Sequence, residues 1–462
     1  MNHWRSFLLL TLGLALKDQP LHAQTAASIT DTVGSLRITP AQFTVRGAAV
    51  EVEEGLFVVP ADRHAFAAKR DTSKLRLAFV RFRSTAATPG APIVFLAGGP
   101  GDAATRALAG MPQALLDQLR AIGDVIAFDQ RGTGRSEPRG VQCPPGGVLP
   151  RDRATTPAHM LEAYTTSIQE CLAKALATGV VVSGLTTEEN ADDIDALRRA
   201  LGATRVSLLA GSYGTHLALA AARRHAAHID RAVLLGVEGP DDTFKLPSRV
   251  DSVLGVIAAS KRPTLAQDIR TLRARLAAAP ATHTAPTGQF IVVGEWDLQR
   301  WIAESLDTVR EIDAMISAIP DLLDAKYSVL AQWAIRSRMP RSFNLMNLAM
   351  NCASYASAPR LARISREAST SLLGATIDFP LPELCAIKGW PRLPDSFRTP
   401  ITGNQRILMI SGTFDGRTPP SNAADIVRTL PNSRALVLDG VSHDLFGDPR
   451  STEAMLTYFR GN

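Results

Sequence analysis

Residues 208–215 read Leu208-Leu209-Ala210-Gly211-Ser212-Tyr213-Gly214-Thr215 and run from an apolar strand, through a turn of small residues, into an Ala-rich helix. A serine in such a turn is held at a strained backbone angle that exposes its hydroxyl, and its small neighbours let strand and helix approach closely. The helix N-terminus favours negative charge that develops nearby. This context predicts that Ser212 is a nucleophile, although Ala210 stands where the usual motif has glycine.

Strands and helices alternate on both sides of this turn, which predicts an α/β fold with a mostly parallel central sheet flanked by helices. The alternating residues 74–83 predict a strand with one buried face, whereas the apolar run 92–97 predicts a strand buried on both faces. Thr187 is the expected N-cap of a helix that reaches Leu201. The other expected strands cover 35–45, 51–60, 125–128, 206–210, 232–237, 406–410 and 435–438, and the other helices cover 213–228, 421–430 and the residues after Asp448.

Residues 240–400 break this alternation and read as helices separated by prolines, including 254–278 and 298–319, with little strand signal. We interpret them as a mainly helical lid inserted into the sheet domain. The expected organisation is therefore a signal peptide (1–23), a first core part (24–239), the lid (240–400) and a second core part (401–462).

A serine hydroxyl needs a base, and the base needs a group that orients it. Of nine histidines, His443 alone follows the last predicted strands, in a turn-rich loop, so it is the expected base. Asp415 follows an apolar strand and is the expected acid, and Glu238, at the end of an earlier strand, is the rival acid. The backbone N–H groups of Tyr213 and of Gly98 or Gly99 are the expected oxyanion hole.

Three other histidines lie on the helix that follows Ser212. We expect His216 to be a packed helix residue. His225 and His228 are expected to be solvated, and without a carboxylate partner they make a weak metal site. We therefore predict no metal.

The first residues resemble a signal peptide, because Arg5 precedes an apolar stretch of about a dozen residues that is too short to span a bilayer. Cleavage after Ala23 fits this interpretation. It predicts an exported protein, periplasmic or secreted, without a stable membrane anchor. The net charge of +6 comes from arginines spread along the chain, so nucleic-acid binding is not expected.

The four cysteines, Cys143, Cys171, Cys352 and Cys385, fit an oxidising compartment. They allow three pairings. We favour the local pairing of Cys143 with Cys171 and of Cys352 with Cys385.

Several motifs together resemble the proline iminopeptidase and tripeptidyl aminopeptidase branch of the α/β-hydrolases. They are Gly-Gly-Pro-Gly (98–101), Asp-Gln-Arg-Gly-Thr-Gly-Arg-Ser (129–136), Gly-Ser-Tyr-Gly-Thr (211–215) and the loops of Asp415 and His443. The resemblance implies an α/β-hydrolase fold, a Ser212–Asp415–His443 triad, and a structural turn over 129–136 that lines the site. Two positions depart from the pattern: Ala97 stands where a histidine often precedes the glycines, and Asp102 follows them.

The function implied is an exported serine hydrolase that cleaves peptide amide bonds from the free N-terminus, without a cofactor. A carboxylesterase or small-molecule amide hydrolase is the alternative, and a catalytically silent binding protein is a third possibility. Members of this branch hold the substrate's ammonium with acidic residues. Glu238 is our candidate for substrate binding, and the other possible carriers are Asp241, Asp242, Glu295 and Glu304. Oligomeric state is left open.

Overall fold

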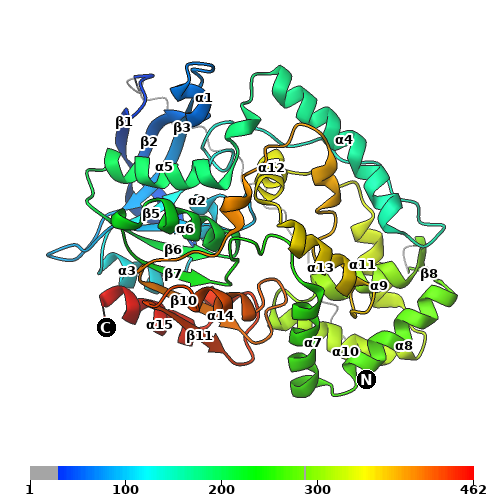
Figure 1. The fold of residues 1–462 in the computed structure, drawn as a ribbon. Helices are drawn as coiled ribbons and strands as arrows, with labels where there is room; N and C mark the ends of the chain where they lie inside the picture. Colours follow the sequence, from blue (N-terminus) through cyan, green and yellow to red (C-terminus); the bar gives the residue numbers. More distant parts are fainter. Residues whose placement is uncertain (1–29, 286–287, 462) are drawn as a thin grey trace.

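The computed structural model describes residues 30–285 and 288–461, so the expected signal peptide lies outside the described residues. A nine-stranded sheet organises the chain, in the order β1-β2-β3-β5-β4-β6-β7-β10-β11 (Figure 1). Six neighbouring strands of this sheet run parallel, and they are β5, β4, β6, β7, β10 and β11. Strands β1, β2 and β3 form an antiparallel extension at one edge. The strands are β1 Leu36–Val45, β2 Ala48–Pro60, β3 Lys74–Phe82, β4 Ile93–Leu96, β5 Val125–Phe128, β6 Val206–Gly211, β7 Ile229–Leu235, β10 Ile407–Gly412 and β11 Ser433–Leu438.

Helices cover both faces of the sheet, which confirms the predicted α/β class. One face packs on α5 (Thr187–Ala200), α6 (Tyr213–Arg224) and α14 (Ser421–Val427). The other packs on α2 (Ala104–Ala109), α3 (Gln113–Arg120) and α15 (Pro449–Arg460). Two apolar cores therefore hold the parallel strands between helical layers, as parallel sheets require.

The strand over 74–83 differs from its prediction, because the last six residues of β3 are all buried. Its alternating arginines suggested an exposed face, but Arg81 is only 8% exposed and forms ion pairs with Glu53 and Asp124. Paired charges can occupy a buried face that the sequence pattern assigns to solvent.

The start of α5 also differs by one residue. Thr186 rather than Thr187 is the N-cap, and its hydroxyl accepts a hydrogen bond from the backbone N–H of Glu189. Thr187 instead bonds the hydroxyls of Tyr213 and Ser354 at 2.8 and 2.9 Å. The side chain that resembled a cap therefore links α5 to two other helices.

Residues 236–406, which we call the insertion, separate two strands that pair in the sheet, β7 and β10. The insertion is mainly helical and has an apolar core of its own. The expected helix 254–278 is two helices, because the helical conformation is disfavoured at Arg262, before Pro263. The helices are α7 Pro247–Lys261, α8 Leu265–Ala278, α9 Glu295–Glu304, α10 Val309–Leu323, α11 Ser328–Ser337, α12 Leu345–Ser354 and α13 Ala358–Ala368.

Two elements on this side of the molecule were not predicted. A hairpin of β8 (Ala281–Thr284) and β9 (Phe290–Val293) lies within the insertion. Helix α4 (Pro157–Ala177) precedes the insertion in sequence but lies on its side of the molecule (Figure 1) and shares an apolar cluster with α12. The helical part of the molecule beside the sheet domain therefore comes from two separate parts of the chain, the insertion and the segment that contains α4.

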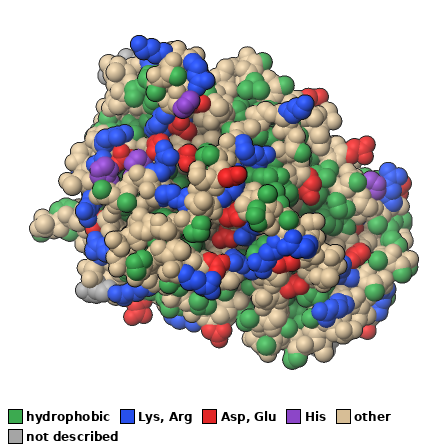
Figure 2. Space-filling view, in the orientation of Figure 1, with side chains coloured by type: hydrophobic (Ala, Val, Ile, Leu, Met, Phe, Trp, Pro, Cys, Tyr) green, Lys and Arg blue, Asp and Glu red, His purple; other side chains and the backbone are tan. Residues whose placement is uncertain are grey.

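Two disulfides join the pairs favoured from the sequence, Cys143 to Cys171 and Cys352 to Cys385. The first ties the segment before α4 to that helix, and the second ties α12 to the segment after α13. None of the helices in the described ranges is long and apolar enough to cross a membrane. Acidic and basic side chains are interspersed over the face seen in Figure 2.

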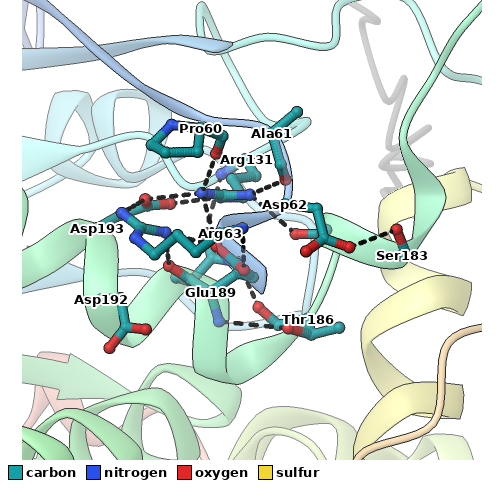
Figure 3. Close-up of polar contacts among 12 residues, drawn as sticks. Pro60, Ala61, Asp62, Arg63, Arg131, Ser183, Thr186, Glu189, Asp192 and Asp193 are labelled. Carbon is teal, nitrogen blue, oxygen red and sulfur yellow. Dashed lines mark hydrogen bonds and ion pairs between the residues drawn. The ribbon is translucent and has the colours of Figure 1, made fainter. Parts of the chain in front are cut away.

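A buried polar cluster joins the end of β2 and the turn after β5 to α5 (Figure 3). Arg131 is 0% exposed and donates to both carboxylate oxygens of Asp193 at 2.6 and 2.9 Å. It also donates to the backbone carbonyls of Pro60, Ala61 and Gly184. The guanidinium is therefore saturated with acceptors, which is the condition for burying a charge without a large penalty.

Candidate active site

Ser212 lies where β6 ends and α6 begins. Its φ and ψ are 53° and −129°, a conformation that is costly for a residue with a Cβ. Its backbone N–H donates to the carbonyl of Leu235 at 2.9 Å, which anchors the turn to β7. A Cβ on Gly214 would lie 2.3 Å from the carbonyl oxygen of Leu96, so only glycine permits this approach of helix and strand.

Ser212 opens into a cavity of about 570 Å³ at the carboxyl ends of the parallel strands. Part of its wall is apolar, from Phe95, Met111, Leu115 and Phe446. The charged or polar side chains on the wall are Arg46, Asp102, Ser212, Asp307, Arg417 and His443. The cavity therefore joins the predicted nucleophile and the predicted base to a binding surface of mixed character.

His443 and Asp415 are in direct contact. His443 Nδ1 lies 2.9 Å from Asp415 Oδ2, and Asp415 is 0% exposed. Asp415 Oδ1 accepts from the backbone N–H groups of Arg417 and Thr418 at 2.9 and 2.7 Å, and Oδ2 accepts from the Thr418 hydroxyl at 2.6 Å. These donors fix the carboxylate, so Nδ1 must carry the proton and Nε2 is the free acceptor on the ring.

The net effect of the surroundings of His443 favours its protonated form, although the charge of Arg417 lowers its pKa. Burial by itself would lower the pKa of His443, but the charge and hydrogen bond of Asp415, together with the charge of Asp307, raise it above its usual value. The insertion also holds the histidine loop in place, because the backbone N–H of His443 donates to the backbone carbonyl of Asp307 at 3.0 Å. Asp307 thus acts on the loop through its backbone and on the imidazole through its charge.

The loop expected to supply the oxyanion hole lies against Ser212. A Cβ on Gly98 would come within 3.0 Å of Ser212 Cβ and 3.5 Å of its Oγ. Gly98 and Gly99 both line the cavity, and Tyr213 begins α6 with its side chain buried. Within the described chain, the backbone N–H groups of Gly98, Gly99 and Tyr213 make no hydrogen bond.

The Ser212 hydroxyl itself has no hydrogen-bond partner among the described residues. Contacts between a catalytic nucleophile and its base are often long without substrate and tighten when it binds. The structure thus shows His443 and Asp415, the predicted base and acid, in contact, with Ser212, the predicted nucleophile, on the same cavity wall as His443.

Glu238 lies away from this cavity. Its carboxylate is buried, 3.7 Å from Lys245 Nζ and 4.0 Å from His216 Nδ1, and it does not touch His443. It is therefore placed neither to orient the base nor to meet a substrate in this cavity. His216 is packed as expected, with its ring between the Gly239 carbonyl and the Ser354 hydroxyl.

The four other acids considered for substrate binding are likewise absent from the cavity wall. Asp241 accepts two hydrogen bonds from Ser357, and Asp242 pairs with Arg360. The remaining two also have cationic partners: Glu295 pairs with Arg273, and Glu304 pairs with Arg300.

Sequence reasoning missed Asp307 and Arg417 as cavity residues. Arg417 had a local signal, since it follows Asp415 by two positions. Asp307 had none, because it reaches the cavity through the packing of the insertion on the sheet. Asp102 was noted only as a departure from a motif, and its carboxylate lines the cavity beside Gly99.

The turn over 129–136 is structural, as expected, but it does not line this cavity. The buried Asp129 carboxylate accepts from Thr105 and from the backbone N–H of Arg135. Gln130 donates to the backbone carbonyl of Ala97 at 3.1 Å. The turn therefore supports the backbone at Ala97, directly before Gly98, without lining the cavity.

Comparison with known proteins finds sequence similarity over part of the chain. The chain is 28% identical over 195 residues to "Serine protease Hip1" of Mycobacterium tuberculosis, which covers 40% of this chain and 36% of that protein. It is 28% identical over 201 residues to a tripeptidyl aminopeptidase of Streptomyces coelicolor (41% and 36% covered). It is 28% identical over 153 residues to a proline iminopeptidase of Xylella fastidiosa (32% and 33% covered). The matched part thus spans about a third of each relative.

The family model described as "alpha/beta hydrolase fold" matches residues 91–449, which include β4 to β11, the insertion and every residue of the cavity after Arg46. The parallel strands of the sheet, the strained serine after β6 and the histidine loop after β11 all fall in this range, whereas β1, β2 and β3 precede it. The chain belongs to the α/β-hydrolase fold family.

Proposed function

We propose that the protein is an exported serine hydrolase that cleaves peptide amide bonds next to a free N-terminus. The observation that carries the proposal is the contact of His443 Nδ1 with the buried Asp415 carboxylate. His443 lines the same cavity as Ser212. The similarity to a serine protease and to two aminopeptidases supports the choice of peptide substrates.

The reaction follows from these positions. His443 Nε2 accepts the proton of the Ser212 hydroxyl as the oxygen attacks the amide carbonyl. The N–H groups of Tyr213 and of Gly98 or Gly99 donate to the oxyanion. His443 then gives its proton to the leaving amine, and water, activated by the same imidazole, cleaves the acyl-enzyme. Asp415 holds the imidazole in the tautomer that this cycle needs.

Two carboxylates on the cavity wall favour a substrate with a free amine. The side chains of Asp102 and Asp307 are exposed there and have no hydrogen-bond or ion-pair partner within the described chain. An ammonium group would pair with either one. Arg417 on the same wall adds a positive charge, which suits a zwitterionic peptide better than a neutral ester.

The apolar part of the wall favours a second candidate, a carboxylesterase. Phe95 and Phe446 meet edge to face, with ring centroids 5.8 Å apart, and offer a surface for an acyl chain. Such an enzyme would turn over short esters and would not distinguish free from acetylated amines.

Peptidyl p-nitroanilides with free and with N-acetylated amines, together with p-nitrophenyl esters, separate the two candidates. We expect cleavage of the free-amine anilides, loss of this activity in Ser212→Ala, and a raised KM for them in Asp102→Asn and Asp307→Asn. Asp444→Asn, an exposed change beside His443, is the matched control. Equal turnover of free and acetylated anilides would contradict the N-terminal specificity, and full activity in Ser212→Ala would contradict the nucleophile.

Export is part of the proposal. It is supported by the composition of residues 1–23 and by two disulfides, which persist in oxidising compartments. N-terminal sequencing of the protein purified from its native cells should begin near Gln24. A protein that retains Met1 would contradict it.

A further inference from the structure

The connection between α6 and β7 carries two histidines that face α5. His225 follows the last residue of α6, and His228 ends the short 3-10 turn Ala226–His228. On α5, the side chain of Asp195 is 3% exposed and lies between them. The expectation that these histidines lack a carboxylate partner is wrong, because the partner comes from a helix thirty residues earlier in the chain.

Both imidazoles present Nδ1 to this carboxylate. His228 Nδ1 lies 3.0 Å from Asp195 Oδ1, and His225 Nδ1 lies 3.9 Å from Asp195 Oδ2. One ligand atom from each of the three residues falls within 4.8 Å of the other two. Tetrahedral Zn²⁺ with bonds near 2.1 Å places its ligand atoms about 3.4 Å apart, so small side-chain rotations would close the site.

The orientation of His228 points to a missing partner. Its Nδ1 is buried and has no hydrogen-bond partner, despite being 3.0 Å from a carboxylate oxygen. The ring nitrogen is therefore close to Asp195 without the geometry of a hydrogen bond to it. A bound ion would give this nitrogen the partner that it lacks.

The other nitrogen of His225 is already engaged. His225 Nε2 lies 2.8 Å from Asp192 Oδ1, and Asp192 is in turn held by Arg224 at 2.8 Å. A carboxylate that accepts Nε2–H leaves Nδ1 unprotonated and fixes the plane of the ring. Metal-bound histidines usually have this carboxylate behind them.

We propose that Asp195, His225 and His228 bind a divalent transition-metal ion, with Zn²⁺ the ion that this donor set suits. Two imidazoles and one carboxylate supply three ligands, and the exposed side of His228 leaves room for water as the fourth. The site lies at the end of α6 opposite Ser212, about 18 Å away along a twelve-residue helix. Its role is structural: it joins α5 to the start of β7.

Two arginines compete with the ion for the carboxylate of Asp195. Arg198 Nε donates to Asp195 Oδ1 at 2.7 Å, and the same side chain holds the backbone carbonyls of Ala203 and Thr204, so it stays in place. Arg199 Nη1 lies 3.0 Å from Asp195 Oδ2, but its side chain is 63% exposed. Arg199 is thus the removable competitor, and Oδ2 is the oxygen available to the metal.

The test is a calorimetric titration of ZnCl₂ into the full-length mature protein at pH 7.5, after removal of any affinity tag and treatment with EDTA. We expect one saturable site, affinity at least tenfold weaker in His225→Gln and in His228→Gln, and several-fold tighter binding in Arg199→Gln. His283→Gln, which changes a histidine of the β8–β9 hairpin, is the control and should bind as the wild type does. Zn²⁺ should raise the Tm of the wild type and not that of His228→Gln.

Three outcomes would overturn the site: no saturable binding by the wild type, equal affinity in the wild type and both ligand variants, or unchanged affinity in Arg199→Gln. Tm without metal reports whether each variant folds. Hydrolytic activity of metal-free His228→Gln should match that of the metal-free wild type, because the site is remote from Ser212.

Discussion

Replacing Asp415 with asparagine tests the proposed chemistry at its most constrained point. Oδ1 of the carboxylate accepts two backbone N–H groups, so the amide of asparagine must place its oxygen there. The NH₂ group must then face His443 Nδ1 and the hydroxyl of Thr418. A donor opposite Nδ1 forces the proton of the imidazole onto Nε2, where it blocks acceptance of the Ser212 proton.

The expected loss is large because the wrong tautomer removes general-base catalysis. Such catalysis contributes about 10²–10⁴-fold in enzymes, and the same substitution in serine triads costs about 10⁴-fold. We expect kcat to fall by about 10³–10⁴, which corresponds to roughly 4–5.5 kcal/mol of transition-state stabilisation. KM should be nearly unchanged, because Asp415 is buried and does not line the cavity.

The assay is steady-state hydrolysis of the best chromogenic substrate at pH 8, with thermal unfolding to check that each variant is folded. Asp444→Asn is the matched control, because it makes the same chemical change at the exposed residue that follows His443 in the sequence. Glu238→Gln is the second comparison, since Glu238 is the rival acid. Both should keep kcat within about twofold of the wild type.

Two results would refute the reasoning. If Asp415→Asn retained more than a tenth of the wild-type kcat, the carboxylate would not control the tautomer of His443. If Glu238→Gln instead lost activity by 10³-fold while remaining folded, the acid would have been misassigned.

The remaining predictions concern stability and pH. Arg131→Met should lower the free energy of unfolding by about 3–5 kcal/mol in urea denaturation, because three buried carbonyls lose their donor and the buried Asp193 carboxylate keeps only Arg63 as its cationic partner; a loss below 1 kcal/mol would show that the cluster adds little. Activity should rise with pH as His443 loses its proton, with a midpoint above that of an unperturbed histidine, because the raised pKa keeps the base protonated to higher pH. Asp307→Asn should move that midpoint of kcat/KM to lower pH, and an unchanged profile would contradict the proposed charge effect. Replacing Cys143 and Cys171 with serine opens a crosslink of 28 residues and should cost roughly 3–4 kcal/mol in the same denaturation assay; an unchanged midpoint would contradict this estimate.

Much of the core was predictable because local signals repeat along the chain. The apolar runs of β4, β5 and β6 and the turn around Ser212 each carry their own pattern, and chain order then indicated His443 and Asp415. The misreadings have tertiary causes. Strand β3 is covered on both faces because ion pairs neutralise its arginines. The N-cap of α5 was predicted one residue too late, because two adjacent threonines offer the same hydroxyl group.

The cavity wall was less predictable, because it is formed by segments that the sequence keeps apart. Asp307 comes from the insertion, Asp102 from the loop after β4, and Arg417 from the loop after β10. The carboxylate of Asp195 beside His225 and His228 was not predicted for the same reason, because it comes from another segment of the chain. No periodicity reports which helix will lie across from another.

The sequence by itself determined the α/β class and placed Ser212 in a strained strand-to-helix turn, because strand and helix periods and turn residues are local properties of the chain. The cavity, the position of Glu238 away from it, and the meeting of Asp195 with two histidines were decided only by the tertiary structure. Each depends on how the insertion and the helical layers pack against the sheet, and packing joins side chains whose distance along the chain carries no local signal.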